Sequence, residues 1–250
     1  MSLYTRPSLK AASLRRGLSR NLWSQAPNDQ SESGAIDEGF GLTDEFLTFD
    51  DENKWVLTQA TAGTAALDVA AKGGVLLLDC NSTTNNQGVQ IQLGGAAGAA
   101  SFIASAASKI YFEARVKIAD IGSTTCQMFV GLAEVDTSVL ASAANTTANH
   151  IGFEAINTTA MGIHSEKAGS RSSTASVHTV VDDDYVKLGF IVDGLTKITP
   201  FVNGVAQTAI TTNIPIVAMT PSFVCHSSGT TDPIVHVDWV ACYQAEHIAN

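Results

Sequence analysis

Two acidic residues that stand one residue apart are the first candidates for chemistry in this sequence. Glu134 and Asp136 follow an expected strand at 128–132. A retaining glycosidase needs an acid and a nucleophilic carboxylate about 5–5.5 Å apart, and the spacing Glu-x-Asp-x-x-Glu places such groups on one strand. Val139 stands at the third acidic position. We therefore expect two exposed carboxylates at a strand end and predict that the protein is not an enzyme.

Two further glutamates lie inside expected strands. Glu113 and Glu154 each have an apolar residue on both sides. Because successive side chains of a strand point to opposite faces of the sheet, we expect both glutamates to be outward-facing charges.

The histidines, aspartates and cysteines give no ligand spacing of a metal site. The six histidines form no His-x-x-x-His pair, and no Cys-x-x-Cys pair occurs. His236 and Asp238 share a strand face, but without a visible nucleophile we expect a surface pair rather than part of a catalytic triad. The aspartates at 182–184 could bind Ca²⁺, but they lack the spacing of a dedicated loop, so we expect a solvated turn. We predict no metal and no cofactor, and we expect thiols at the four cysteines, which are Cys80, Cys126, Cys225 and Cys242.

The composition limits the kind of fold that positions these residues. The chain has 250 residues, a formal net charge of −10 and 45% hydrophobic residues. This is enough apolar chain for one large domain or two small ones, and it excludes wholesale disorder. No stretch approaches the roughly 18 apolar residues of a spanning helix, so we expect no membrane partner. The acidic body would repel phosphate, so we expect no specific nucleic-acid partner.

Residues 54–250 alternate between apolar and polar side chains as strands do. Within 109–118, every second residue is apolar and the residues between them are polar, except for Tyr111. Asn203 and Gly204 predict a type I′ hairpin, because both central residues of that turn need a positive φ. About a dozen short strands at this spacing predict an all-β fold, a two-sheet antiparallel jelly-roll sandwich. Further expected strands are 75–78, 89–93, 128–132, 151–156, 185–192, 198–202 and 234–243.

Residues 1–23 are expected to form an extended basic N-terminal arm. They carry five Lys and Arg residues and no acidic residue, which leaves a charge of −15 on residues 24–250. Leu14, Leu18 and Leu22 recur at the spacing of a helical stripe, which Trp23 closes. Three interpretations are open: an organelle transit peptide, a solvated tail, or an arm fixed on a partner. We favour the third, because Arg and Lys pair well with acidic or carbonyl-rich surfaces.

Residues 24–53 predict an extended linker or surface segment between the arm and the sandwich. The first part is rich in Ser, Asn, Gln and Gly, which is typical of loops. The second part interleaves acidic residues with Phe40, Phe46 and Phe49, which we interpret as a solvated acidic segment with aromatic anchors.

The order of the strand motifs resembles the concanavalin A-like (laminin-G-like) jelly roll of tailed-bacteriophage virion proteins. The resemblance covers roughly residues 45–245 and depends on the order of its motifs. These motifs are 109–117, 129–134, 150–154, 184–194, 197–205, 219–223 and 237–240.

This resemblance implies a non-enzymatic capsid cement or decoration subunit on the outer surface of the virion, assembled in the host cytoplasm. The sandwich would project outward, and the arm would staple neighbouring copies of the phage major capsid protein. We also expect dimers or trimers of the chain. The alternative is a lectin-like module of a phage tail or head fibre that binds a host-surface glycan. The residues predicted to contact the capsid are Arg6, Lys10, Leu14, Arg15, Arg16, Leu18, Arg20, Leu22 and Trp23.

Overall fold

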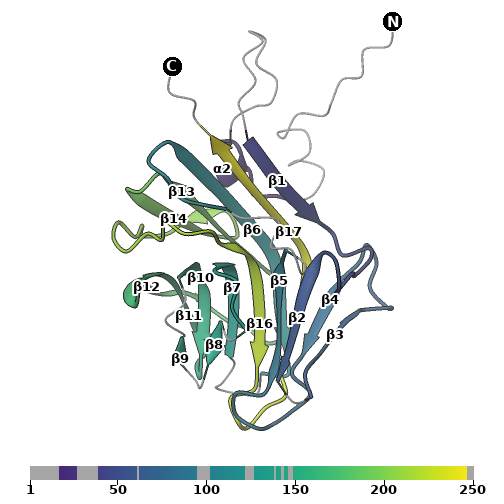
Figure 1. Cartoon of the computed structure of the whole chain (residues 1–250). Coiled ribbons are helices and arrows are strands. Elements are labelled where there is room, and N and C mark those ends of the chain that lie inside the picture. The colour runs from purple at the N-terminus through teal and green to yellow at the C-terminus, as the bar shows by residue number, and fades with distance from the viewer. Residues whose placement is uncertain are drawn as a thin grey trace, which may run out of the picture.

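Two antiparallel sheets lie face to face in the computed structural model of the chain (Figure 1). The structure describes residues 17–26, 39–60, 62–94, 102–121, 127–137, 139–141, 144–145 and 149–246. Within these residues, no helix is long and apolar enough to cross a membrane. The predicted two-sheet jelly-roll sandwich is confirmed.

Sheet A has eight strands, and its longest members, β6 and β17, are neighbours at its centre. Strands β1 and β4 both pair with the edge of β17 opposite β6. Strand β1 pairs with its C-terminal half and β4 with its N-terminal part. In spatial order the strands are β15 (Val205–Ala206), β14 (Lys197–Val202), β13 (Val186–Asp193), β6 (Ser108–Ala119), β17 (Ile234–Glu246), β4 (Leu76–Asp79) and β3 (Thr64–Leu67), with β1 (Gly39–Asp44) beside β17.

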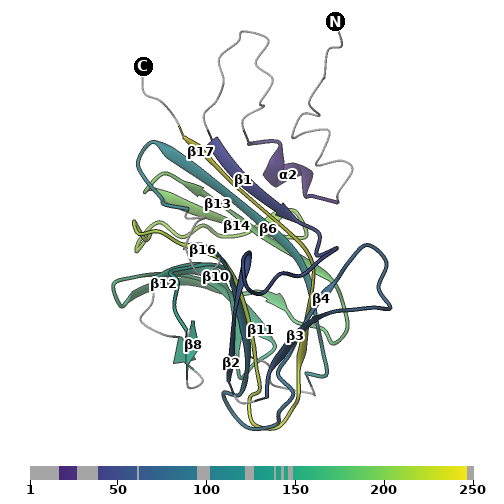
Figure 2. The same ribbon diagram turned by 45° about the vertical axis from the view of Figure 1, so that its right-hand side comes forward.

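Sheet B has seven strands, and a small separate hairpin of β8 (Leu140–Ala141) and β9 (Ala144–Asn145) follows β7. Strand β8 lies on the side of sheet B that faces away from sheet A (Figure 2). In spatial order the strands of sheet B are β12 (Ser170–Thr179), β11 (Ala160–Lys167), β10 (His150–Ile156), β7 (Gln127–Ala133), β16 (Thr220–His226), β5 (Gly88–Leu93) and β2 (Trp55–Ala60).

The core lies between the two sheets and is built from every second residue of their strands. Phe112 and Phe190 of sheet A stack with their ring centroids 4.9 Å apart, and Phe153 of sheet B lies 6.5 Å from Phe190. All three side chains are fully buried. Burial of each such side chain contributes about 1.5–3 kcal/mol, so the alternation seen in the sequence is also the main source of stability.

The predicted hairpin at Asn203 and Gly204 is present between β14 and β15. Asn203 has a φ of 50° and Gly204 a φ of 77°, the positive values that a type I′ turn requires. The turn matters for the N-terminal segment, because the carbonyl of Gly204 accepts a hydrogen bond from Asn21 Nδ2 at 3.0 Å.

The segment 24–53, expected as a linker, includes a strand of the sandwich. Strand β1 runs antiparallel to β17 from Gly39 opposite Ala245 to Asp44 opposite Val240. Asp44 is buried, and its carboxylate accepts hydrogen bonds from Trp55 Nε1 at 2.9 Å and from the Phe46 amide at 2.9 Å. These contacts fix the start of the sandwich well before residue 54.

Residues 17–26, which we call the anchor segment, pack on the outer face of sheet A. They include one short helix, α2 (Arg20–Trp23), which lies on the side of sheet A turned away from sheet B (Figure 2). Leu22 and Trp23 are buried there against Tyr111, Ile191 and other residues of the sheet. The sequence predicted a helical stripe of leucines that includes Leu18, but Leu18 lies outside α2, so the helix is shorter than expected.

Candidate functional site

The outer face of sheet B carries an unusual set of buried polar side chains. Inward residues of its strands belong to the core, whereas outward positions include Glu154 on β10 and His164 on β11. Buried polar groups need partners, because an unpaired one costs roughly 1–3 kcal/mol. The buried polar residues of this face are Gln90, Gln92, Gln127, His150, Glu154, Glu166, Thr220, Ser222 and His226.

Part of this face is covered by the chain that follows β7. The side-chain amide of Gln92 donates to the carbonyl of Glu134 at 2.9 Å, and its oxygen accepts from the amide of Asp136 at 3.0 Å. Gln90 accepts from the amide of Val139 at 3.0 Å. These hydrogen bonds cover the outer face of β5 at Gln90 and Gln92. The strands β10, β11 and β12 lie on the other side of β7.

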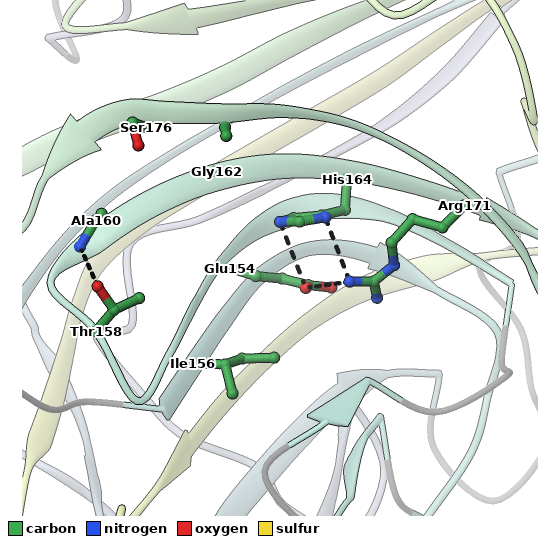
Figure 3. A pocket seen from close by; sticks show the side chains of 9 residues that line it. Glu154, Ile156, Thr158, Ala160, Gly162, His164, Arg171 and Ser176 are labelled. Carbon is green, nitrogen blue, oxygen red and sulfur yellow. Dashed lines mark hydrogen bonds and ion pairs between the residues drawn. The ribbon is translucent and has the colours of Figure 1, made fainter.

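A pocket of 280 Å³ opens over those three strands. Glu154, His164 and Arg171 meet at one side of it, and dashed lines in Figure 3 mark their contacts. We call this site the Glu154 pocket. Its lining residues are Glu154, Ile156, Thr158, Ala160, Gly162, His164, Arg171, Ala175 and Ser176.

Glu154 is the centre of a charged cluster in this pocket. Its carboxylate lies 3.4 Å from Arg171 Nη1 and 3.8 Å from His164 Nε2. His150 Nε2 lies 2.9 Å from the second carboxylate oxygen. Arg171 also binds the neighbouring carboxylate of Glu166 through Nε at 3.0 Å. One guanidinium therefore links two carboxylates on adjacent strands.

The surroundings set the protonation of the two groups that line the pocket most directly. Burial raises the pKa of Glu154, but the hydrogen bond from His150 and the charges of His150, His164 and Arg171 outweigh it, so the pKa lies below its usual value. Burial lowers the pKa of His164, and the nearby Arg171 adds to this, although Glu154 opposes it. At neutral pH the pocket therefore presents a carboxylate, a guanidinium and a neutral imidazole.

This arrangement suits binding of a neutral polar ligand. The carboxylate accepts hydrogen bonds, the guanidinium donates them, and a neutral imidazole can do either. Two carboxylates face one guanidinium, so an anion would be repelled. Ile156, Ala160 and Ala175 give the pocket an apolar wall. Such pockets commonly combine apolar walls with a few oriented polar groups.

The two glutamates expected as outward-facing charges do point to the outer faces of the sheets, but both are buried. Glu154 is 3% exposed and Glu113 is 0% exposed. Glu113 Oε2 accepts hydrogen bonds from the Ser19 amide and from Trp23 Nε1, both at 2.8 Å. The alternation of the strand gave the direction of both side chains, but it carries no information about what lies over them.

Four of the residues predicted to contact the capsid belong to the anchor segment: Leu18, Arg20, Leu22 and Trp23. Leu22 and Trp23 are buried in the chain's own domain, and Leu22 fits where Gly189 has no side chain, since a Cβ there would lie 2.7 Å from Leu22 Cδ1. These two side chains are therefore not available to a shell. Leu18 is partly buried and Arg20 is exposed. The other predicted arm residues, Arg6, Lys10, Leu14, Arg15 and Arg16, lie outside the described residues.

The carboxylates tested for glycanase spacing have other roles. Glu134 Oε2 accepts hydrogen bonds from the amide and the side chain of Asn149 at 3.1 and 2.6 Å. Glu134 and Asp136 are partly buried rather than exposed, and Val139 packs into a small apolar cluster on the outer face of sheet B. A motif along one strand could not find Glu154, because that residue lies on β10, which pairs with β7 in the sheet.

The remaining candidates do not form a second site among the residues that the structure describes. Asp238 forms a salt bridge with Arg115, and Asp183 one with Lys117. Within the described ranges, no group of three or more His, Cys, Asp or Glu side chains could hold a metal ion. Cys80, Cys225 and Cys242 are buried and form no disulfide among the described residues, and Cys126 lies outside the described part.

No protein-family model and no curated protein matches this sequence. Solved structures do resemble it. A protein of unknown function from Shewanella oneidensis MR-1 aligns with a TM-score of 0.60 and 12% identity, over 85% of this chain and 89% of that one. Peanut lectin aligns with a TM-score of 0.60 and 14% identity, over 85% and 100%. A glycoside hydrolase family 16 endo-glucanase from Bacteroides ovatus aligns with a TM-score of 0.54 and 14% identity, over 80% and 98%.

The fold is the concanavalin A-like jelly roll. At these identities the likeness shows the fold alone, and this fold hosts several functions. The jelly-roll part of the resemblance seen in the sequence is confirmed, and its virion part stays a prediction.

The prediction that the protein is not an enzyme was wrong, because glucanases are among the structures that share this sandwich. That prediction depended on the absence of an acidic residue at position 139, where the sequence has Val139. The structure shows a different pair of carboxylates, Glu154 and Glu166, joined through Arg171.

Proposed function

We propose that this protein is a carbohydrate-binding module and that the Glu154 pocket holds one sugar unit of its ligand. The observation that carries the proposal is the buried Glu154 carboxylate, which is held by Arg171, His164 and His150 at the side of an open pocket. Sugar hydroxyls both donate and accept hydrogen bonds, and these fixed groups supply both functions.

The size and charge of the pocket support a single neutral sugar ring. Its volume of 280 Å³ is at the small end of ligand sites, which usually span about 300–1,000 Å³. The apolar wall suits the C–H face of the ring. Two of the similar structures are named as a lectin and an endo-glucanase, so β-glucans and lectin ligands are the first compounds to test.

A glycan array followed by calorimetric titration tests the proposal. We expect Glu154→Gln to weaken binding of the best ligand about 10- to 100-fold, because hydrogen bonds to charged groups contribute about 1.5–3 kcal/mol. Asp193→Asn is the matched control, since Asp193 lies on sheet A and forms an exposed salt bridge with Lys109. Equal affinity of the two variants, or no signal on the array, would contradict the proposal.

The same titration samples show whether the bound glycan is also cleaved. Release of reducing ends from a β-glucan by the wild-type chain, lost in Glu154→Gln, would assign hydrolysis to this pocket. The low pKa of Glu154 makes it a base or nucleophile rather than a proton donor at neutral pH.

The virion role is a second proposal, which one observation supports. The anchor segment is fixed on sheet A by Lys187 Nζ, which donates to the carbonyl of Gly17 at 3.0 Å, and by Asn21. The basic residues at 6–16 therefore precede a fixed point on the sandwich. Deleting residues 1–16 leaves these contacts in place, so it tests shell attachment without disturbing the fold. Undiminished binding of the shortened chain to purified shells would contradict a capsid cement role.

A further inference from the structure

A second polar position lies on the same face as the Glu154 pocket and in register with it. Ile156 of the pocket is opposite Gln127 on β7, and Gln127 is opposite His226 on β16. The three residues form a row across the strands on the outer face of sheet B. His226 is followed in the row by Gly88 on β5.

His226 is the unexplained member of this row. It is 7% exposed, and its Nδ1 has no hydrogen-bond partner in the described structure. Burial lowers its pKa to about 4, so the ring is neutral at neutral pH. A buried polar nitrogen without a partner is rare in folded proteins and calls for a physical explanation.

The imidazole of His226 is held in place. A Cβ at Gly88 would lie 2.7 Å from His226 Cδ2, so the ring packs directly over the backbone of β5, where only glycine leaves room for it. A fixed ring with an unpaired nitrogen is prepared to bind a group of complementary polarity without an entropic cost of ordering.

Amide side chains surround the next position of the row. Gln127 Nε2 donates to Asn85 Oδ1 at 3.0 Å and to Asn157 Oδ1 at 3.1 Å. Gln127 is buried, whereas Asn85 and Asn157 are exposed. Amide groups donate and accept hydrogen bonds, as sugar hydroxyls do. Asn157 also stands between Ile156 and Thr158 of the Glu154 pocket, so this polar edge continues directly from it.

We infer that the Glu154 pocket is one end of an extended site, and that its ligand is an oligosaccharide that crosses β11, β10, β7 and β16 and gives a hydroxyl to His226 Nδ1. Strands lie about 4.8 Å apart, so the strands of His164 and His226 are separated by about 14 Å, which is more than one sugar ring spans. The inference rests on the proposed function, because it assumes that the pocket binds sugar. Because His226 Nδ1 is buried, the inference requires that the exposed side chains of Asn85 and Asn157, beside Gln127, move when the ligand binds.

Titrations with glucose and with mixed-linkage β-gluco-oligosaccharides up to the hexasaccharide test this inference. We expect affinity to rise with chain length in the wild-type protein. His226→Phe keeps a planar ring but removes the nitrogens, so we expect it to leave glucose binding unchanged and to weaken hexasaccharide binding about three- to tenfold. His236→Phe on sheet A is the matched control, since that histidine is only partly buried and lies on the other sheet.

The wild-type protein gives a second readout if His226→Phe does not fold. In nuclear magnetic resonance spectra, the ring signals of His226 should shift with the hexasaccharide and not with glucose. Equal affinity for glucose and hexasaccharide, or unmoved His226 signals at saturation, would overturn the extended site and leave the Glu154 pocket standing. Absence of binding by every compound in the series would overturn the pocket and the extended site together.

Discussion

Glu113 of sheet A and Glu154 of sheet B both point away from the core, but their surroundings differ. Each lies on a strand in the interior of its sheet, and each is almost completely buried. Glu113 lies beneath the anchor segment, which seals it with Ser19 and Trp23. Glu154 lies at the side of an open pocket.

The partners of the two carboxylates explain their opposite pKa shifts. Burial raises the pKa of Glu113, and the neutral donors of Ser19 and Trp23 together with the more distant Lys187 do not cancel it. Glu154 has a guanidinium and two imidazoles around it, and its pKa is lowered. A buried glutamate is therefore not a functional site by itself; the charges beside it and an opening to solvent make the difference.

Truncation of the Trp23 side chain in the anchor segment should give the largest change in the free energy of unfolding. Trp23→Ala removes a buried aromatic side chain and the hydrogen bond to Glu113, and such core truncations cost about 3–5 kcal/mol. We expect a loss near 3 kcal/mol in the free energy of unfolding, because the anchor can detach while the sandwich stays folded. Denaturant unfolding followed by circular dichroism measures it, with Trp23→Phe as a milder control. A loss below about 0.5 kcal/mol would show that the anchor does not stabilise sheet A.

Removal of the Arg171 guanidinium from sheet B should lower the free energy of unfolding by a smaller amount. Arg171→Ala leaves Glu154 and Glu166 facing each other without the guanidinium that joins them. Breaking a fully buried pair costs about 3–5 kcal/mol, but the Arg171 side chain is 30% exposed, so we expect about 2 kcal/mol. Lys109→Ala breaks an exposed pair with Asp193 and should cost at most about 1 kcal/mol. Equal losses in the two variants would contradict the special role of Arg171.

The smallest expected effect is on the pH dependence of stability, to which Glu113 and Glu154 should contribute in opposite directions. The pKa of Glu113 is raised on folding, so its contribution is full below the ordinary value of 4.5 and is lost as the pH rises through the raised value. The pKa of Glu154 is lowered, so its contribution is full above 4.5 and is lost as the pH falls through the lowered value.

Glu113→Gln should therefore remove the fall in stability above pH 4.5, and Glu154→Gln the fall below it. Thermal unfolding over a pH series measures both. Parallel pH profiles of the wild-type chain and Glu113→Gln would contradict the shift assigned to Glu113.

The architecture could be predicted from the sequence because burial between two sheets leaves a period of two. The strand expected at 109–118 is β6, and Asn203 with Gly204 forms the expected turn. Strand β12 was not predicted, since Ser170–Thr179 forms an edge strand that is mostly exposed and rich in serine and threonine. Because no residue of β12 is fully buried, burial imposes no regular alternation on its side chains.

The candidate site could not be predicted in the same way. Glu154, His164 and Arg171 lie on three strands, and only the register of β10, β11 and β12 brings them together. The burial of Glu113 depends on Ser19 and Trp23, which lie 94 and 90 positions away along the chain. Periodicity reports which face a side chain occupies, whereas its partners across the sheet follow from topology.

The most direct test of the account is to map a bound glycan on the chain by nuclear magnetic resonance. We predict that the best ligand from the array shifts the signals of Glu154, His164 and Arg171 and leaves those of Leu22, Trp23 and Glu113 unchanged. Shifts confined to the anchor segment and the outer face of sheet A would contradict the assignment of the binding site to sheet B.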